Sequence, residues 1–289
     1  MTGSPLANPG ATRALLEAYG LATKHSLGQN FLVNNHVIEK IMDLAELGEK
    51  DRVLEVGPGI GTLTLALLAE AGHVVSIEMD RELEPVLSAH AAAHPNFSFI
   101  MGDALRVTPD QIAEAAGSEP DVLVANLPYN VAATVILRYL QEVPSLRRLV
   151  VMVQAEVADR ICADPGNRTY GAYTAKLALL AQVTGRFEVG PGNFMPPPHV
   201  DSAVVRLDRL SQKGTGANWD IAAVSAVIDA AFAQRRKTIR NSMSASGFSR
   251  DALDAAFAET GIQPTCRAET LAPADFVRLS DALSQAVSQ

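Results

Sequence analysis

The four residues Asn126-Leu127-Pro128-Tyr129 follow a strand-like run and have the chemistry to activate an amine. An exocyclic amine on an aromatic ring is a poor nucleophile because its lone pair is delocalised into the ring. The side-chain oxygen of Asn126 and a neighbouring backbone carbonyl could accept hydrogen bonds from both N–H groups, which would free the lone pair. Pro128 contributes no N–H, and Tyr129 offers a ring on which an unstacked base could lie. The same residues would otherwise form an ordinary turn, because Asn and Pro are common turn formers.

This chemistry indicates methyl transfer to an adenine amine, with all four residues as catalytic candidates. No metal and no strong general base is needed when a sulfonium carries the methyl group, because the product ammonium loses its proton readily. A base inside a double helix could not reach such a loop, so the substrate adenine is expected to be unpaired or flipped out.

A glycine-rich turn, Gly57-Pro58-Gly59-Ile60-Gly61-Thr62, separates a strand-like run from an apolar helical stretch. Glycines let the backbone turn tightly and approach a ligand in the crevice at the carboxyl end of the strand. The spacing is G-x-G-x-G rather than the G-x-G-x-x-G of dinucleotide folds. It favours S-adenosylmethionine over NAD as the cofactor, and a dehydrogenase is the weakest interpretation.

Two acidic residues follow the next two predicted strands. Glu78 stands where a carboxylate can accept both ribose hydroxyls of a nucleotide-like cofactor. Asp103 is placed to accept a hydrogen bond from the adenine amine of that cofactor. Either acid alone could be a solvated strand end, but together with the glycine turn they favour a binding site.

Short β-branched runs alternate with helical stretches from Arg52 to about Leu207. This alternation predicts an α/β domain with a mostly parallel sheet and helices on both faces. A helix with an apolar face from Val37 to Ala45 is expected before it, capped by Asn34 or Asn35 and ended by Gly48. The predicted strands are Val53–Val56, Val74–Ile77, Phe97–Ile100, Val122–Ala125, Leu149–Val153 and Ala203–Leu207.

After Leu207 the pattern changes to helices only. A polar linker, Ser211 to Asn218, precedes predicted helices at Ile221–Met243, Arg250–Thr260 and Pro273–Val287. A domain boundary is therefore predicted between residues 208 and 209, with a large domain over 1–208 and a small helical domain over 209–289.

Composition agrees with a globular chain of two units, since 48% of the 289 residues are hydrophobic and 19% are charged. Two cysteines cannot build a disulfide framework, which favours a reducing compartment. No segment approaches the roughly 18 apolar residues of a membrane span. We therefore expect a cytoplasmic monomer without membrane attachment.

The net charge of -8 is unfavourable for an RNA-binding protein, but the cations are unevenly distributed. The stretch from Ala230 to Arg250 contains cations and no acid. A predicted helix there would usually present only a solvated charged face, yet the lack of acidic neighbours favours phosphate contact. The cations of this stretch are Arg235, Arg236, Lys237, Arg240 and Arg250, of which the first four lie on the predicted helix.

Five ordered motifs make the chain resemble the ribosomal RNA adenine dimethyltransferase family from His25 to the C-terminal helix. They are His25–Leu32, Glu55–Thr62, Asn126–Asn130, Phe194–Ser202 and Arg235–Asn241. The resemblance implies a Rossmann-like methyltransferase domain that includes an N-terminal cofactor-wrapping segment, and a helical RNA-contacting domain. It also implies four methyl transfers from S-adenosylmethionine to two adjacent adenosines in the 3′-terminal hairpin loop of 16S rRNA, in the small ribosomal subunit or its precursor, with a late role in assembly of that subunit.

The motif match also implies roles for individual residues. Phe194 would lie on the other face of the target base from Tyr129, although alone it would more often fill a core or loop. Val131-Ala132-Ala133 departs from the Ile-Ser-Thr expected after the catalytic loop, which bears on fine substrate positioning only. The basic residues Arg235, Arg236, Lys237 and Arg240 would contact RNA. The cofactor would be bound by Asn30, Leu32, Gly57, Gly59, Glu78, Asp103 and Asn126.

Two other functions remain open on the sequence. An Erm-like enzyme would methylate adenine in 23S rRNA, but the long helical tail and the Arg235–Asn241 stretch favour the 16S substrate. A ribosome assembly factor for which methylation is secondary would use the same RNA-binding surface, and the sequence does not separate it from the enzyme.

Overall fold

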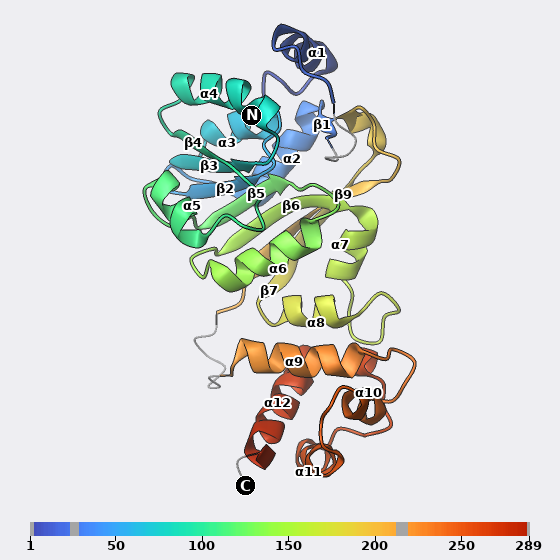
Figure 1. Cartoon of the computed structure of the whole chain (residues 1–289). Coiled ribbons are helices and arrows are strands. Elements are labelled where there is room, and N and C mark those ends of the chain that lie inside the picture. Colours follow the sequence, from blue (N-terminus) through green and yellow to red (C-terminus); the bar gives the residue numbers. More distant parts are fainter. Residues whose placement is uncertain (1–2, 24–28, 212–218, 288–289) are drawn as a thin grey trace. The chain divides into compact units, whose positions relative to one another are not determined.

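The computed structural model describes residues 3–23, 29–211 and 219–287 and divides the chain into two compact units (Figure 1). The first unit comprises Met1–Ala158 and Val183–Arg209, and the second comprises Asp159–Gln182 and Leu210–Gln289. The expected boundary at 208 and 209 adjoins one of these transitions, but Asp159–Gln182 groups with the helical unit because its contacts are made there. Apart from Ser211, the expected linker lies outside the described residues.

A seven-stranded sheet forms the centre of the first unit, in the order β4-β3-β2-β5-β6-β9-β7. The strands from β4 to β6 are parallel, and β9 joins β6 antiparallel. The predicted mostly parallel sheet is confirmed. The bounds are β2 Arg52–Val56, β3 His73–Glu78, β4 Phe97–Met101, β5 Val122–Asn126, β6 Arg148–Gln154, β7 Ala181–Val189 and β9 Ser202–Arg209.

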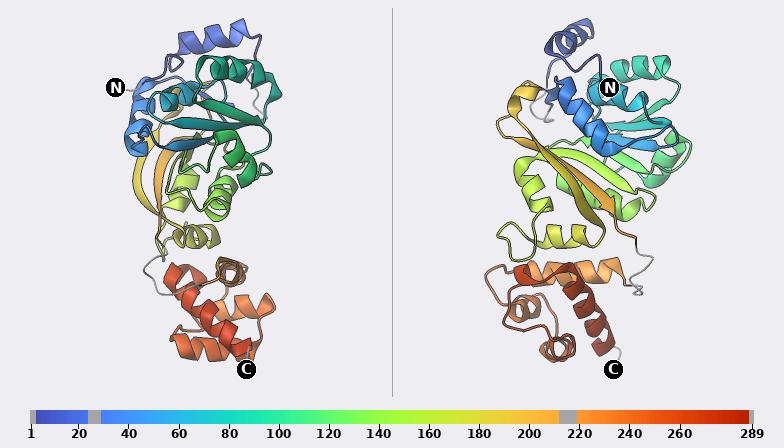
Figure 2. Two further views of the ribbon diagram at one scale, coloured as in Figure 1. Left: turned by 90° about the vertical axis from the view of Figure 1, so that its left-hand side faces the viewer. Right: turned by 180° about the vertical axis from the view of Figure 1, so that it is seen from behind.

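Helices lie on both faces of this sheet (Figure 2). Val53, Val122 and Val150 lie on the neighbouring strands β2, β5 and β6 and pack in one cluster with the apolar faces of α2 and α3. The central strands are therefore buried continuously rather than alternately, as expected for a parallel sheet covered on both sides. The helices between residues 3 and 161 are α1 Pro9–Ala18, α2 Asn35–Ala45, α3 Thr62–Leu68, α4 Glu84–Ala93, α5 Pro109–Ala116, α6 Ala132–Glu142 and α7 Ala155–Ile161.

Helix α2 has the predicted apolar face, and Asn34 caps its start by accepting a hydrogen bond from the His36 N–H. The predicted end at Gly48 is wrong, because the helix stops at Ala45 and Glu46 takes the left-handed backbone conformation with φ 46°. Arg148 and Arg206 bind the Glu46 carboxylate at 3.0 and 2.9 Å. These ion pairs hold a residue other than glycine at the helix end.

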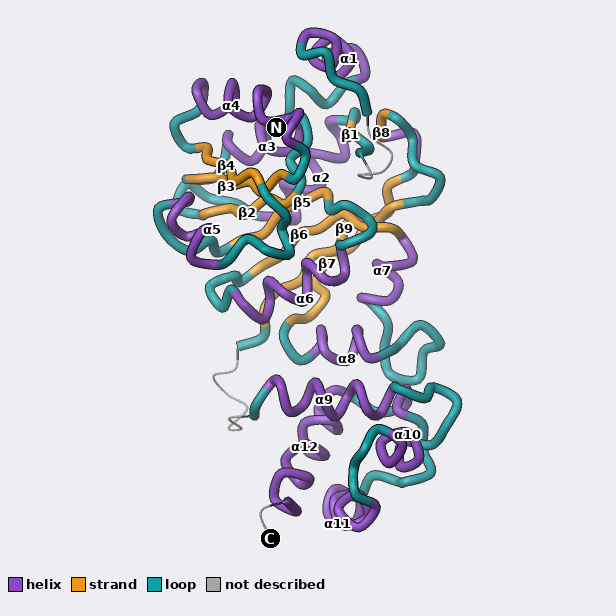
Figure 3. The backbone as a smooth tube through the Cα atoms, viewed as in Figure 1, coloured by secondary structure: helices purple, strands orange, loops and turns teal. Residues whose placement is uncertain are grey.

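The described C-terminal part is helical (Figure 3). Its core contains Tyr170, Phe232 and Phe276, whose successive ring centroids are 6.0 and 5.8 Å apart. No helix in the described ranges is long and apolar enough to cross a membrane. The second unit contains α8 Ala172–Ala178, α9 Ile221–Phe232, α10 Ile239–Ala245, α11 Arg250–Thr260 and α12 Pro273–Val287.

The predicted single helix Ile221–Met243 is wrong, because the chain breaks between α9 and α10. Thr238 begins α10 as its N-cap and accepts a hydrogen bond from the Asn241 N–H. The buried Ser242 hydroxyl donates to the Ala230 carbonyl and accepts from the Gln234 N–H. Ser242 thus supplies partners to backbone groups that the break leaves without helical ones.

Candidate functional site

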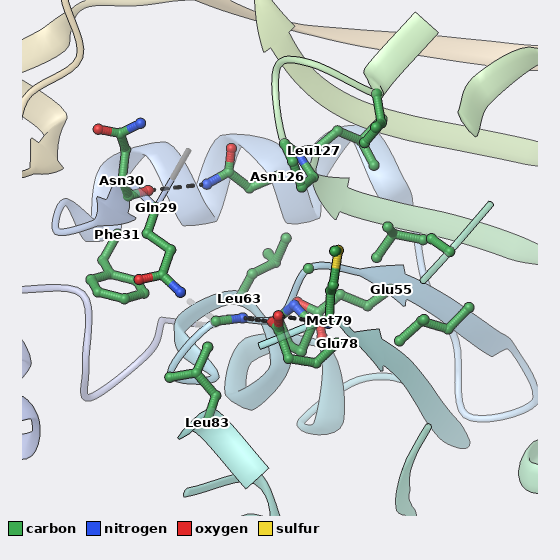
Figure 4. A pocket seen from close by; sticks show the side chains of 18 of the residues that line it. Gln29, Asn30, Phe31, Glu55, Leu63, Glu78, Met79, Leu83, Asn126 and Leu127 are labelled. Atoms are coloured by element: carbon green, nitrogen blue, oxygen red, sulfur yellow. Dashed lines mark hydrogen bonds between the residues drawn. The ribbon is translucent and has the colours of Figure 1, made fainter. Parts of the chain in front are cut away.

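A cavity of about 300 Å³ lies at the carboxyl ends of β2 to β5 (Figure 4). The strand order reverses between β2 and β5, which is where open α/β sheets bind ligands. The cavity brings together every predicted cofactor residue and the whole catalytic loop. Its lining includes Asn30, Leu32, Gly57, Gly59, Glu78, Asp103, Asn126, Leu127, Pro128 and Tyr129.

The glycine turn needs glycine at two of these positions. Gly57 and Gly59 have φ angles of 72° and 59°, which side-chain-bearing residues rarely adopt. A Cβ on Gly59 would lie 3.0 Å from the Phe31 ring. The turn therefore brings its backbone close to β1 (Phe31–Leu32) and leaves the cavity open to a ligand.

Glu78 connects the glycine turn to the end of β3. It is 7% exposed, and its carboxylate accepts hydrogen bonds from the N–H groups of Gly59, Met79 and Asp80 at 2.8 to 3.1 Å. A carboxylate has about four acceptor positions. Glu78 Oε2 accepts only the Gly59 N–H among these bonds, so it keeps capacity for a ligand hydroxyl.

Sequence reasoning missed Glu55, a carboxyl group that lines the cavity from within β2. It is 1% exposed, and its Oε2 accepts hydrogen bonds from the hydroxyls of Thr64 and Ser76 at 2.7 Å each. Burial raises the pKa of Glu55 to about 7. Glu55 opens the motif Glu55–Thr62 and stands inside an apolar run, but neither signal reveals its two hydroxyl partners from other elements.

The Glu55→Gln variant is expected to gain stability relative to the wild type as the pH rises. The raised pKa favours the folded state fully below pH 4.5, and this contribution is lost as the pH rises to about 7. Glutamine does not ionise, so the variant avoids this loss of about 3 kcal/mol in the free energy of unfolding. Urea unfolding at pH 5 and pH 8 measures the difference. Glu114→Gln on the exposed face of α5 is the control, and an equal gain at both pH values would contradict the prediction.

Asn126 ends β5, and its side-chain nitrogen points at the Asn30 carbonyl oxygen at 3.4 Å (Figure 4). This contact leaves the Asn126 oxygen as the acceptor for a ligand. Pro128 O already accepts the N–H groups of Val131 and Ala132 at the start of α6. Leu127 is anchored by its N–H to the Met152 carbonyl, and its own carbonyl is therefore the better second acceptor.

Phe194 is placed differently from the prediction. It is 4% exposed, packs in the main core, and is absent from the cavity lining within the described chain. It belongs to β8 (Phe194–Met195), which pairs with β1 so that Phe194 faces Leu32. This pairing fixes Leu32 at the cavity and turns the Phe194 ring into the core. The His25–Gly28 part of the first motif lies outside the described residues.

An N-terminal element without a sequence prediction supports the same wall. Helix α1 begins at Pro9, and the Asn8 side chain caps it by accepting the Ala11 N–H. Leu16 from this helix clusters with Phe31 and Leu83, which both line the cavity. The helix thereby backs the cavity wall.

Of the four predicted RNA-contacting cations, two are paired with acids of this chain and two have exposed side chains. Arg235 and Arg240 form ion pairs with Glu269 and Asp254, at 3.4 and 2.6 Å. The stretch itself contains no acid, but these two arginines pair with acids from later in the chain, which the sequence pattern did not predict. Arg236 and Lys237 are exposed, and their side chains make no hydrogen bond or ion pair with the described residues. They lie between α9 and α10 rather than on the predicted helix.

The comparisons with known proteins agree across nearly the whole chain. A family model described as ribosomal RNA adenine dimethylase matches residues 20–285. Ribosomal RNA small subunit methyltransferase A of Thermobifida fusca is 43% identical over 281 residues, covering 96% of both chains. The protein of the same name from Rhodococcus opacus is 42% identical, covering 95% of this chain and 94% of its own.

Two solved structures share the fold. A dimethyladenosine transferase from Plasmodium falciparum superposes with a TM-score of 0.76 at 24% identity, covering 89% of this chain and 98% of that one. The 23S rRNA methyltransferase ErmE has a TM-score of 0.64 at 26% identity, covering 89% of this chain and all of its own.

Proposed function

Because this chain belongs to the ribosomal RNA adenine dimethylase family, we propose that it dimethylates adenine amines in small-subunit ribosomal RNA with S-adenosylmethionine. The proposed targets are two adjacent adenosines in the 3′-terminal hairpin loop of 16S rRNA. The observation that carries the proposal is the position of the Asn126 loop, on the same cavity as the glycine turn and two acids.

The cavity suits S-adenosylmethionine, which supplies a methyl group on a sulfonium. Glu78 would accept a ribose hydroxyl through the remaining capacity of its Oε2. Asp103 has its Oδ1 bound to the Leu105 N–H and lines the cavity, so it would accept from the adenine amine. The turn at Gly57 and Gly59 leaves room for the cofactor beside β1.

The chain's own groups would position the target amine. Asn126 Oδ1 and the Leu127 carbonyl would accept its two N–H groups and aim the nitrogen lone pair into the cavity. Tyr129 lines the cavity and would stack on the flipped base. Burial raises the pKa of Tyr129, so the ring stays neutral. Phe194 would reach the base only after its ring leaves the core.

The small-subunit substrate is favoured over the large-subunit one by the degree of similarity. The small-subunit relatives are 42 and 43% identical, against 26% for ErmE. Expression in a bacterium that lacks dimethyladenosine in its 16S rRNA tests this proposal. Primer extension should regain its stops at the two adenosines, and intact extension with normal levels of folded protein would count against it.

The exposed pair Arg236 and Lys237 is proposed to contact RNA phosphates. Replacing both with alanine is expected to weaken binding to small-subunit RNA. The slope of the logarithm of the binding constant against the logarithm of the salt concentration should become shallower by about 0.7 to 0.9 for each cation lost. Filter binding across a salt series measures both effects. Arg278→Ala, which removes an exposed cation paired with Asp275 in the same unit, is the control. An unchanged salt slope in the double variant would remove these residues from the RNA contact.

A further inference from the structure

The Tyr129 hydroxyl is hydrogen-bonded to the Ser202 hydroxyl at 2.7 Å. Ser202 is fully buried, whereas the Tyr129 ring is half-buried and lines the cavity. The two residues are 73 positions apart. The ring of Tyr129 is thus held at its far end by a side chain that does not itself line the cavity within the described chain.

Sheet topology explains why these residues meet. Tyr129 follows the carboxyl end of β5, and β6 lies between β5 and β9. Because β9 is antiparallel to β6, its first residue, Ser202, pairs with Gln154 at the end of β6. The Ala155 N–H also donates to the Asp201 carbonyl at 2.9 Å. The backbone of Ser202 is therefore fixed beside the carboxyl ends of β5 and β6, where the catalytic loop begins.

We propose that Ser202 is a positioning residue for methyl transfer, which sets the orientation of the Tyr129 ring against the target base. This inference rests on the proposed function. A tyrosine side chain rotates about two bonds. Its hydroxyl lies on the axis of the ring rotation, so anchoring the Tyr129 hydroxyl to Ser202 limits the rotation about Cα–Cβ and fixes the direction in which the ring points. The ring is then preorganised for stacking, so that the cost of ordering it is not incurred when the base arrives. The hydrogen bond to Ser202 also keeps the Tyr129 hydroxyl away from the reacting groups.

A double-mutant cycle tests the proposal. The variants Ser202→Ala, Tyr129→Phe and the combined pair are assayed for methyl transfer to unmethylated small subunits. Each single change removes the same hydrogen bond and is expected to lower the methylation rate at saturating RNA roughly fivefold. The double variant should be no slower than either single variant, since the bond can be lost only once. The cofactor dissociation constant should stay unchanged.

Ser98→Ala is the matched control. It removes a hydroxyl from the edge strand β4, far along the sheet from β9, and this hydroxyl donates to the Ala115 carbonyl of α5. Its rate should equal that of the wild type. Single effects that multiply in the double variant, an unimpaired Ser202→Ala protein, or equal slowing by Ser98→Ala would overturn the proposal. If Ser202→Ala fails to fold, Tyr129→Phe measures the effect of losing the same hydrogen bond. A wild-type protein without methyl transfer would instead overturn the proposed function on which the inference rests.

Discussion

Replacing Asn126 with alanine is expected to lower the rate of methyl transfer about 10²- to 10³-fold, the usual effect of removing one preorganised hydrogen-bonding group from a reacting centre. The side-chain oxygen is the proposed acceptor for the target amine, and without it the nitrogen lone pair is neither freed nor aimed. The cofactor dissociation constant should change far less than the rate, because the turn and the acids remain. Single-turnover transfer and calorimetric cofactor titration separate the two quantities.

Asn96→Ala is the control for this experiment. Its side-chain nitrogen donates to the Leu68 and Ala71 carbonyls at 3.1 and 3.3 Å, so the change also removes an amide from the first unit. It lies before β4 and outside the cavity lining within the described chain. An Asn126→Ala protein that is as fast as the Asn96→Ala protein would refute the role of Asn126.

Glu78→Ala is expected to weaken S-adenosylmethionine binding on the order of 100-fold, because hydrogen bonds to charged groups contribute more than neutral ones. The change removes the proposed acceptor for the ribose. It also leaves the N–H groups of Gly59, Met79 and Asp80 without the partner that shapes the turn. Calorimetric titration of the folded variant measures the loss.

A surface acid close in sequence provides the comparison for Glu78. Glu84 lies exposed at the start of α4, and Glu84→Ala should bind the cofactor as the wild type does. If Glu78→Ala keeps wild-type affinity while it folds, the proposed position of the ribose is wrong.

Much of the sheet could be predicted because its strands are continuous apolar runs buried on both faces. The helices Arg250–Thr260 and Pro273–Val287 are confirmed at the predicted residues, since Ser249 and Gly261 are strong capping residues for the first of them. In these cases the signal is local. The capping chemistry and apolar periodicity determine the element wherever it packs.

The missed elements depend on contacts distant in sequence. Strand β7 lies at the sheet edge with mostly exposed polar residues, so its sequence resembles a loop. The short strands β1 and β8 exist only because they pair with each other. That pairing buries Phe194, which the motif alone had placed beside the target base.

The site shows the same division between local and distant information. The glycine spacing and the acids after successive strands predicted residues that line one cavity. The partners that tune those residues could not be predicted, because Ser76 and Ser202 come from other strands. Likewise, Asp254 and Glu269 come close to Arg240 and Arg235 only in the folded helical unit. Their ion pairs leave Arg236 and Lys237 as the exposed cations of the basic stretch without an acidic partner among the described residues.

The most direct test is transfer of labelled methyl from S-adenosylmethionine to salt-stripped, unmethylated 30S and 50S particles, with the modified nucleosides identified by mass. The proposed function predicts dimethyladenosine in the 16S rRNA of the 30S particle and no label in the 50S particle. Label in 23S rRNA, or in neither particle despite bound cofactor, would contradict it.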